Sequence, residues 1–63
     1  MTLQEMREAK NLTQSQVATE IGVVPSLVTM WESGARKPYN HADRLSKLYN
    51  VTIETIFLAT KTT

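Results

Sequence analysis

The chain of 63 residues lacks cysteine, has a single histidine, His41, and contains no long apolar run. The absence of cysteine excludes disulfides and thiolate metal sites, and a lone histidine has no second imidazole with which to bind a metal ion. We therefore expect neither a metal nor a cofactor. No segment approaches the roughly 20 apolar residues that span a bilayer, so we expect no membrane contact. The residues after Met1 are polar and charged, unlike a signal peptide, which predicts a cytoplasmic protein.

The chain also lacks a strong excess of either charge, because its formal net charge is +1. That balance hides an uneven distribution. Residues 13–34 contain two acidic side chains and no basic one, whereas residues 35–50 contain four basic side chains and one acidic. A DNA-binding protein normally concentrates basic charge on the face that docks on DNA. The distribution therefore argues against strong non-specific DNA binding through residues 13–34.

Glycine and proline are scarce, two of each, and they stand where helices should begin or end. Gly22 and Gly34 follow apolar segments and suit the left-handed ends of helices, whereas Pro25 fits the first turn of one. Thr2 and Thr13 each open a capping box. The apolar spacing predicts an all-α chain whose helices cover about residues 3–10, 14–21, 25–33, 41–49 and 53–59.

Two further caps and the end of the chain complete the predicted organisation. Asn40 should cap the fourth helix and Thr52 the fifth, and both side chains suit that position. We expect residues 1–59 to form a single domain and residues 60–63 a flexible tail. The chain offers no nucleophile–base pair, no metal cluster and no phosphate-binding glycine loop, so we expect no enzyme activity.

Residues 12–38 are the most informative stretch. They predict two short helices joined by a tight turn at Gly22 and followed by a stop at Gly34. Such a pair is typical of a helix-turn-helix, which usually reads DNA through its second helix.

The strings MREAKNLTQ (6–14), IGV (21–23), WESG (31–34), KP (37–38) and YNV (49–51) together resemble the Xre or Cro/cI type of helix-turn-helix domain. The resemblance covers about residues 3–58. It implies a five-helix, lambda-repressor-like bundle that acts in transcriptional control, as in phage repressors, Cro proteins and small phage switch modulators. We interpret the chain as the DNA-binding module alone or as a small stand-alone regulator.

The resemblance also implies roles for individual residues. Gln14 matches a residue that contacts a phosphate and braces the third helix, and Lys37 and Asn40 match backbone contacts. Arg7 and Glu32 match a partly buried ion pair. The matched core residues are Val23, Val28 and Trp31, and the matched base-reading positions are Pro25, Ser26, Thr29 and Met30.

The third helix departs from this pattern because it lacks the side chains that usually read bases. Major-groove readout favours Arg or Lys on guanine and Asn or Gln on adenine, and residues 25–33 contain none of these. Val24 also stands where the family has a capping Ser or Thr. The apolar residues here predict an exposed patch that docks on another protein. The residues assigned to this partner surface are Val24, Pro25, Leu27, Val28, Thr29 and Met30.

Two mechanisms remain open. The first is a regulator of a phage-type switch that pairs with a repressor protein through this surface and so modulates operator binding. The second is a Cro-like regulator that itself binds operator DNA as a homodimer. The DNA-binding residues are then Gln14, Ser26, Thr29, Arg36, Lys37 and Asn40. A third alternative leaves the patch without function, with Leu27 turned inward and Met30 half-exposed. Arg44 and Lys47 are interpreted as a solvated surface.

Overall fold

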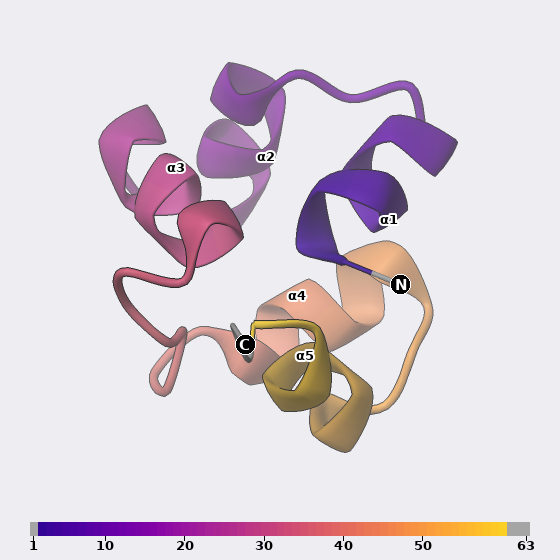
Figure 1. Ribbon diagram of the computed structural model, residues 1–63. Helices are drawn as coiled ribbons and strands as arrows, with labels where there is room; N and C mark the ends of the chain where they lie inside the picture. The colour runs from indigo at the N-terminus through magenta and orange to yellow at the C-terminus, as the bar shows by residue number, and fades with distance from the viewer. Residues whose placement is uncertain (1, 61–63) are drawn as a thin grey trace.

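The computed structural model describes residues 2–60 and confirms the all-α prediction, because no strand occurs in this range. Five helices follow one another along the chain: α1 (Leu3–Ala9), α2 (Gln14–Ile21), α3 (Pro25–Ser33), α4 (Ala42–Tyr49) and α5 (Ile53–Ala59). Helix α2 packs on α3 and α4 packs on α5, while α1 contacts α3 (Figure 1). The result is a small helical bundle in which α2 and α3 lie at the opposite side from α5.

The predicted helix starts follow from the capping residues. The Thr2 hydroxyl accepts from the Glu5 amide at 3.1 Å, and the Glu5 carboxylate accepts from the Thr2 amide at 2.7 Å. Thr13 and Gln16 form the same reciprocal pair at the start of α2. Both pairs satisfy amides that a helix start leaves without an internal partner.

The core lies where the five helices meet and is mainly aliphatic around one indole. Trp31 of α3 is 2% exposed and belongs to one buried cluster with Val17 and Ile21 of α2, Leu45 of α4 and Ile56 of α5, which are each 2% exposed or less. Burial of these side chains supplies most of the stability of such a small domain. Leu48 of α4 lies at the edge of this core and is half-buried.

The turn between α2 and α3 depends on a left-handed residue. Gly22 has φ of +90°, and its amide donates to the Ala18 carbonyl at 2.7 Å. Arg44 of α4 then donates from Nη1 to the Ile21 carbonyl at 2.8 Å. Arg44, interpreted from the sequence as part of a solvated surface, is exposed, but it also has this contact with the end of α2, which the sequence did not indicate. A cation suits the end of a helix, where carbonyls lack internal partners.

The start of α4 differs from the prediction. His41, and not Asn40, is the N-cap, and it forms no side-chain cap hydrogen bond. The turn around buried Pro38 causes the shift, because the His41 amide donates to the Pro38 carbonyl at 3.2 Å. The His41 carbonyl accepts the first helical bond from Leu45, so the helix begins one residue later than expected.

Thr60, which the sequence predicts to lie in a flexible tail, is ordered at the end of α5. Thr60 is 3% exposed, its amide donates to the Ile56 carbonyl, and its hydroxyl donates to the Phe57 carbonyl at 2.9 Å. Thr60 therefore closes the last helix. Residues 61–63, the rest of the predicted tail, lie outside the described residues.

Within residues 2–60, none of the helices is both long and apolar enough to cross a membrane.

Candidate nucleic-acid interface

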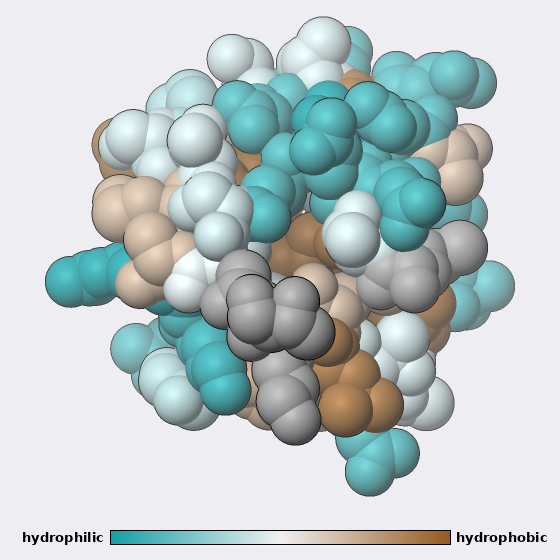
Figure 2. Space-filling model, viewed as in Figure 1, coloured by the Kyte–Doolittle hydropathy of each residue, from teal (hydrophilic) through white to brown (hydrophobic). Residues whose placement is uncertain are grey.

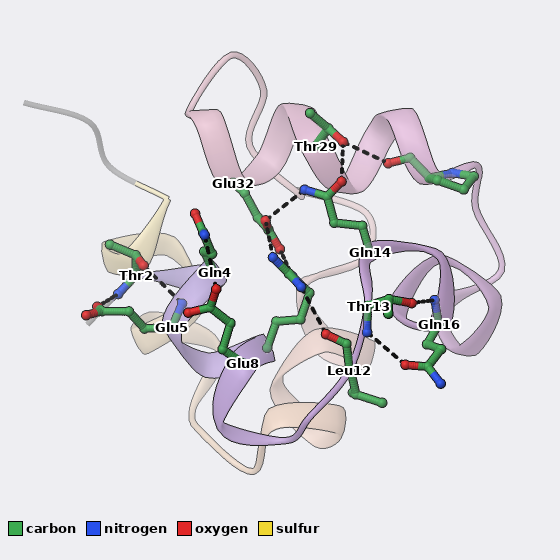
Figure 3. A network of polar contacts seen from close by, with 12 residues as sticks. Thr2, Gln4, Glu5, Glu8, Leu12, Thr13, Gln14, Gln16, Thr29 and Glu32 are labelled. Carbon is green, nitrogen blue, oxygen red and sulfur yellow. Dashed lines mark hydrogen bonds and ion pairs between the residues drawn. The ribbon is translucent and has the colours of Figure 1, made fainter.

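A polar network joins the start of α2 to the middle of α3 (Figure 3). Gln14 lies between two α3 residues, and its Nε2 donates to Glu32 Oε1 at 2.9 Å. The Thr29 hydroxyl lies 2.8 Å from Gln14 Oε1 and 3.3 Å from the Pro25 carbonyl oxygen. Gln14 and Thr29, both predicted from the sequence to bind DNA, are in direct contact with each other.

The network ends at the ion pair between Arg7 of α1 and Glu32 of α3. Arg7 Nε lies 2.6 Å from Glu32 Oε2, and Arg7 Nη1 donates to the Leu12 carbonyl at 2.9 Å. The two side chains are only 13% and 6% exposed. The hydrogen bond to Glu32 raises the pKa of Arg7 above its usual range. This pair ties three segments of the chain together.

The exposed side of α3 carries hydroxyls and few apolar groups. Because an α-helix turns by about 100° per residue, Ser26, Thr29, Met30 and Ser33 lie on one side. Ser26, Thr29 and Ser33 are exposed and Met30 is half-buried. Ser33 was not assigned a role from the sequence, although its spacing from Ser26 and Met30 places it on this side.

The predicted protein-docking patch is smaller than expected. Val28 is 1% exposed and belongs to the core, so its assignment to a partner surface was wrong. Leu27 packs against the core and is half-buried, because its position on the helix turns it toward the loop after α3. Val24, which is 62% exposed, and Pro25 remain as freely accessible apolar residues. Val24 forms no side-chain cap, as its side chain predicts.

The loop after α3 presents two basic side chains. Arg36 and Lys37 are exposed, and within residues 2–60 neither side chain forms an ion pair or a side-chain hydrogen bond. The loop is held close to α3, because the Arg36 amide donates to the Met30 carbonyl at 3.3 Å. A hollow lies between loop and helix, lined by Leu27, Trp31, Arg36, Lys37, Pro38, Tyr39, Asn40 and His41. Asn40, one of the lining residues, is exposed.

Two aromatic contacts order the same region. The rings of His41 and Trp31 have centroids 5.5 Å apart, and those of Tyr39 and Phe57 lie 5.7 Å apart. Tyr39 therefore packs on α5 but remains 72% exposed. Among residues 2–60, no group of three His, Cys, Asp or Glu residues is placed to hold a metal ion.

Tyr49 is the buried phenol of the bundle. Burial raises the pKa of Tyr49 to about 12, and the charge of Glu32 acts in the same direction while Arg7 opposes it. The usual pKa of tyrosine is about 10. Because the folded chain binds the phenolic proton more tightly than the unfolded chain, Tyr49 contributes fully to stability below about pH 10. That contribution is lost as the pH rises toward the folded pKa.

We expect the free energy of unfolding to fall by about 1.4 kcal/mol per pH unit between these two pKa values because of Tyr49. Tyr49→Phe lacks the phenol and serves as the control for other groups that titrate there. In Tyr39→Phe, Tyr49 is the sole remaining tyrosine. Its phenolate absorbance should then appear near pH 12. Titration at the ordinary pKa would show that burial does not hold the proton.

The side of the molecule shown in Figure 2 carries its most hydrophilic residues around α1 and paler, weakly polar residues over α3. Apolar atoms are visible over α5, where Ile53 and Leu58 are exposed. The surface formed by Gln14, the exposed side of α3 and the Arg36–Lys37 loop is thus mildly polar, with basic charge at one border.

Comparison with known proteins gives two findings. A family model described as helix-turn-helix matches residues 3–56. Over 53 residues the chain is 40% identical to the HTH-type transcriptional activator BcrR of Enterococcus faecalis, and the match covers 82% of this chain and 26% of that protein. The chain therefore spans about a quarter of the length of this relative. No solved structure shows a significant match to the chain.

Proposed function

The chain belongs to the Xre or Cro/cI type of helix-turn-helix family, and on this basis we propose that it regulates transcription by binding double-stranded operator DNA. In this proposal the exposed side of α3 enters the major groove, while Gln14 and the Arg36–Lys37 loop contact phosphates on either side. In this proposal the chain binds its DNA in the cytoplasm.

The observation that supports this proposal is the placement of polar and basic side chains, suited to phosphate contact, on both sides of α3. Thr29 and Leu27 lie on opposite sides of α3, since residues two positions apart in an α-helix are separated by about 200° around its axis. Gln14 contacts Thr29, and the loop with Arg36 and Lys37 borders Leu27. A helix in a groove needs donors to the sugar–phosphate strands on both sides, because phosphate contacts fix its register.

The first test is binding of the purified chain to a fluorescently labelled pool of random 20-base-pair duplexes, followed by anisotropy at several salt concentrations. We expect an affinity that falls as the salt concentration rises, because bound cations on DNA are released by Lys and Arg. Absence of binding at low salt, or an affinity independent of salt, would contradict the proposal.

A homodimer would place two α3 helices about one DNA turn apart and add the affinities of two half-sites. Ile53 and Leu58 of α5 are 43% and 65% exposed and offer apolar surface for a second copy. Sedimentation of the chain with and without DNA measures this state. A 1:1 complex on duplexes of two half-sites would argue against the dimer.

The second candidate function is pairing with a repressor protein of a phage-type switch. It is favoured by exposed Val24 and Pro25 at the start of α3, beside a helix that has no Arg, Lys, Asn or Gln. Such a chain would cover the DNA-reading surface of its partner and modulate operator binding indirectly. The repressor partner would then hold most of the base-specific contacts.

Val24→Asp tests this candidate without endangering the fold. Aspartate places a charge on the apolar surface and also supplies the N-cap that α3 lacks, so we expect stability to rise by about 1 kcal/mol. Retention of a repressor by the wild-type chain and its loss with Val24→Asp would support pairing. If both chains retained the repressor equally, and circular dichroism showed that both are folded, Val24 would be excluded from the pairing surface.

A further inference from the structure

The exposed side of α3 carries three hydroxyl side chains, and two of them are already hydrogen-bonded within the chain. The Ser33 hydroxyl donates to the Met30 carbonyl at 3.1 Å. The Thr29 hydroxyl donates toward Gln14 Oε1 at 2.8 Å, with the Pro25 carbonyl as a longer alternative at 3.3 Å. Within residues 2–60, Ser26 has no such partner. A hydroxyl has one proton to donate, so Thr29 and Ser33 keep only acceptor capacity toward a base.

The Gln14 amide is held at both of its ends. Its Oε1 accepts from Thr29 and its Nε2 donates to Glu32, which is itself held by Arg7. Rotation of the amide by half a turn would place its oxygen against the Glu32 carboxylate, so the Glu32 contact selects the orientation of the amide. In this orientation the Thr29 hydroxyl donates to Gln14 Oε1 and holds the other end of the amide against α3. A primary amide has two N–H groups, so Gln14 retains one N–H for an external acceptor.

We infer that Thr29 is a positioning residue for Gln14 and does not read a base: it holds the amide so that the remaining N–H faces a DNA phosphate. This inference rests on the DNA-binding function proposed above. It assigns the free hydroxyl donor on the exposed side of α3 to Ser26 alone. Met30 is left to meet a thymine methyl.

The inference separates affinity from sequence preference. A phosphate contact strengthens binding to every duplex by the same factor, whereas a base contact changes the preferred base at one position. Loss of the Thr29 hydroxyl should therefore weaken binding uniformly. Loss of the Ser26 hydroxyl should change the preferred sequence.

The experiment compares the wild-type chain with Thr29→Val, Thr29→Ser and Ser26→Ala. Each chain first selects duplexes from a random 20-base-pair pool. Its affinity for the wild-type-selected duplex and for a mixed-sequence duplex is then measured by anisotropy. We expect Thr29→Val to bind both duplexes about fivefold more weakly and to select the same sequence, because one hydrogen bond is lost. Thr29→Ser keeps the hydroxyl and should restore the affinity.

A double-mutant cycle shows whether Thr29 acts through Gln14. When Gln14 is already replaced by alanine, adding Thr29→Val should cause no further loss of affinity. A merely structural role would predict additive losses instead. Thr19→Val is the matched control, since Thr19 is an exposed threonine of α2 whose hydroxyl donates to the Ser15 carbonyl within its own helix. We expect it to bind as the wild type does, and thermal unfolding checks every variant.

Three outcomes would overturn the inference. A changed sequence preference in Thr29→Val would make Thr29 a base reader, and additive losses in the cycle would remove Gln14 as its target. A third is failure of the wild-type chain to bind either duplex, which would overturn the proposed function as well. The first two leave DNA binding intact, so the failures are distinguishable.

Discussion

Glu32→Ala should lower the free energy of unfolding by about 3 kcal/mol, because it leaves the largely buried Arg7 guanidinium without its carboxylate. The guanidinium would keep only its bond to the Leu12 carbonyl. Gln14 would also lose the acceptor of its Nε2. A domain of this size has a total stability on the order of 5 kcal/mol, so this change would remove much of it.

The measurement is denaturant unfolding followed by the fluorescence of Trp31, the single tryptophan. Glu8→Ala is the matched control: it also removes a carboxylate, but from the exposed surface of α1, and should change stability by no more than about 0.5 kcal/mol. A second variant separates the stranded charge from the lost contact. Arg7→Met with Glu32→Ala removes both charges and should recover part of the loss. If Glu32→Ala had the same free energy of unfolding as Glu8→Ala, the expected role of the ion pair would be contradicted.

The local features of the fold could be read from the sequence. The capping boxes at Thr2 and Thr13 involve residues three apart, and the left-handed ends at Gly22 and Gly34 require only that a residue tolerate positive φ. These signals act within one helix turn. They therefore indicated the starts of α1 and α2 and the ends of α2 and α3 without knowledge of the packing.

The features that were missed depend on the packing of distant segments. Arg44 reaches the Ile21 carbonyl from another helix, and Thr29 reaches Gln14 across the helix pair. Asn40 has good capping chemistry, but the turn at Pro38 moves the helix start past it. Val28 illustrates the limit at the candidate site: it is buried between half-buried Leu27 and exposed Thr29. A rotation of α3 by one residue would have placed Leu27 or Thr29 in the core instead of Val28. Periodicity alone leaves such a rotation undetermined.

Neutralising the loop after α3 should produce the largest loss of DNA binding. In the double variant Arg36→Gln with Lys37→Gln, two exposed cations beside α3 lose their charge. We expect affinity for a mixed-sequence duplex to fall on the order of 30-fold at low salt, since each charged phosphate contact contributes about 1 kcal/mol. The slope of log affinity against log salt should decrease by about two. Stability should be unchanged, because neither side chain has a partner within residues 2–60.

The control is Lys10→Gln with Lys47→Gln, which changes the net charge by the same amount, from +1 to −1. Lys10 lies beyond the end of α1, and Lys47 of α4 pairs with Asp43 at 3.5 Å on the exposed surface. Because a protein's overall charge acts on DNA from a distance, part of any loss should appear in this control too. A much larger loss in the loop variant would locate the phosphate contacts beside α3. Equal losses would mean that the loop does not touch DNA, and the pairing of Val24 and Pro25 with a repressor would then explain the exposed start of α3 better.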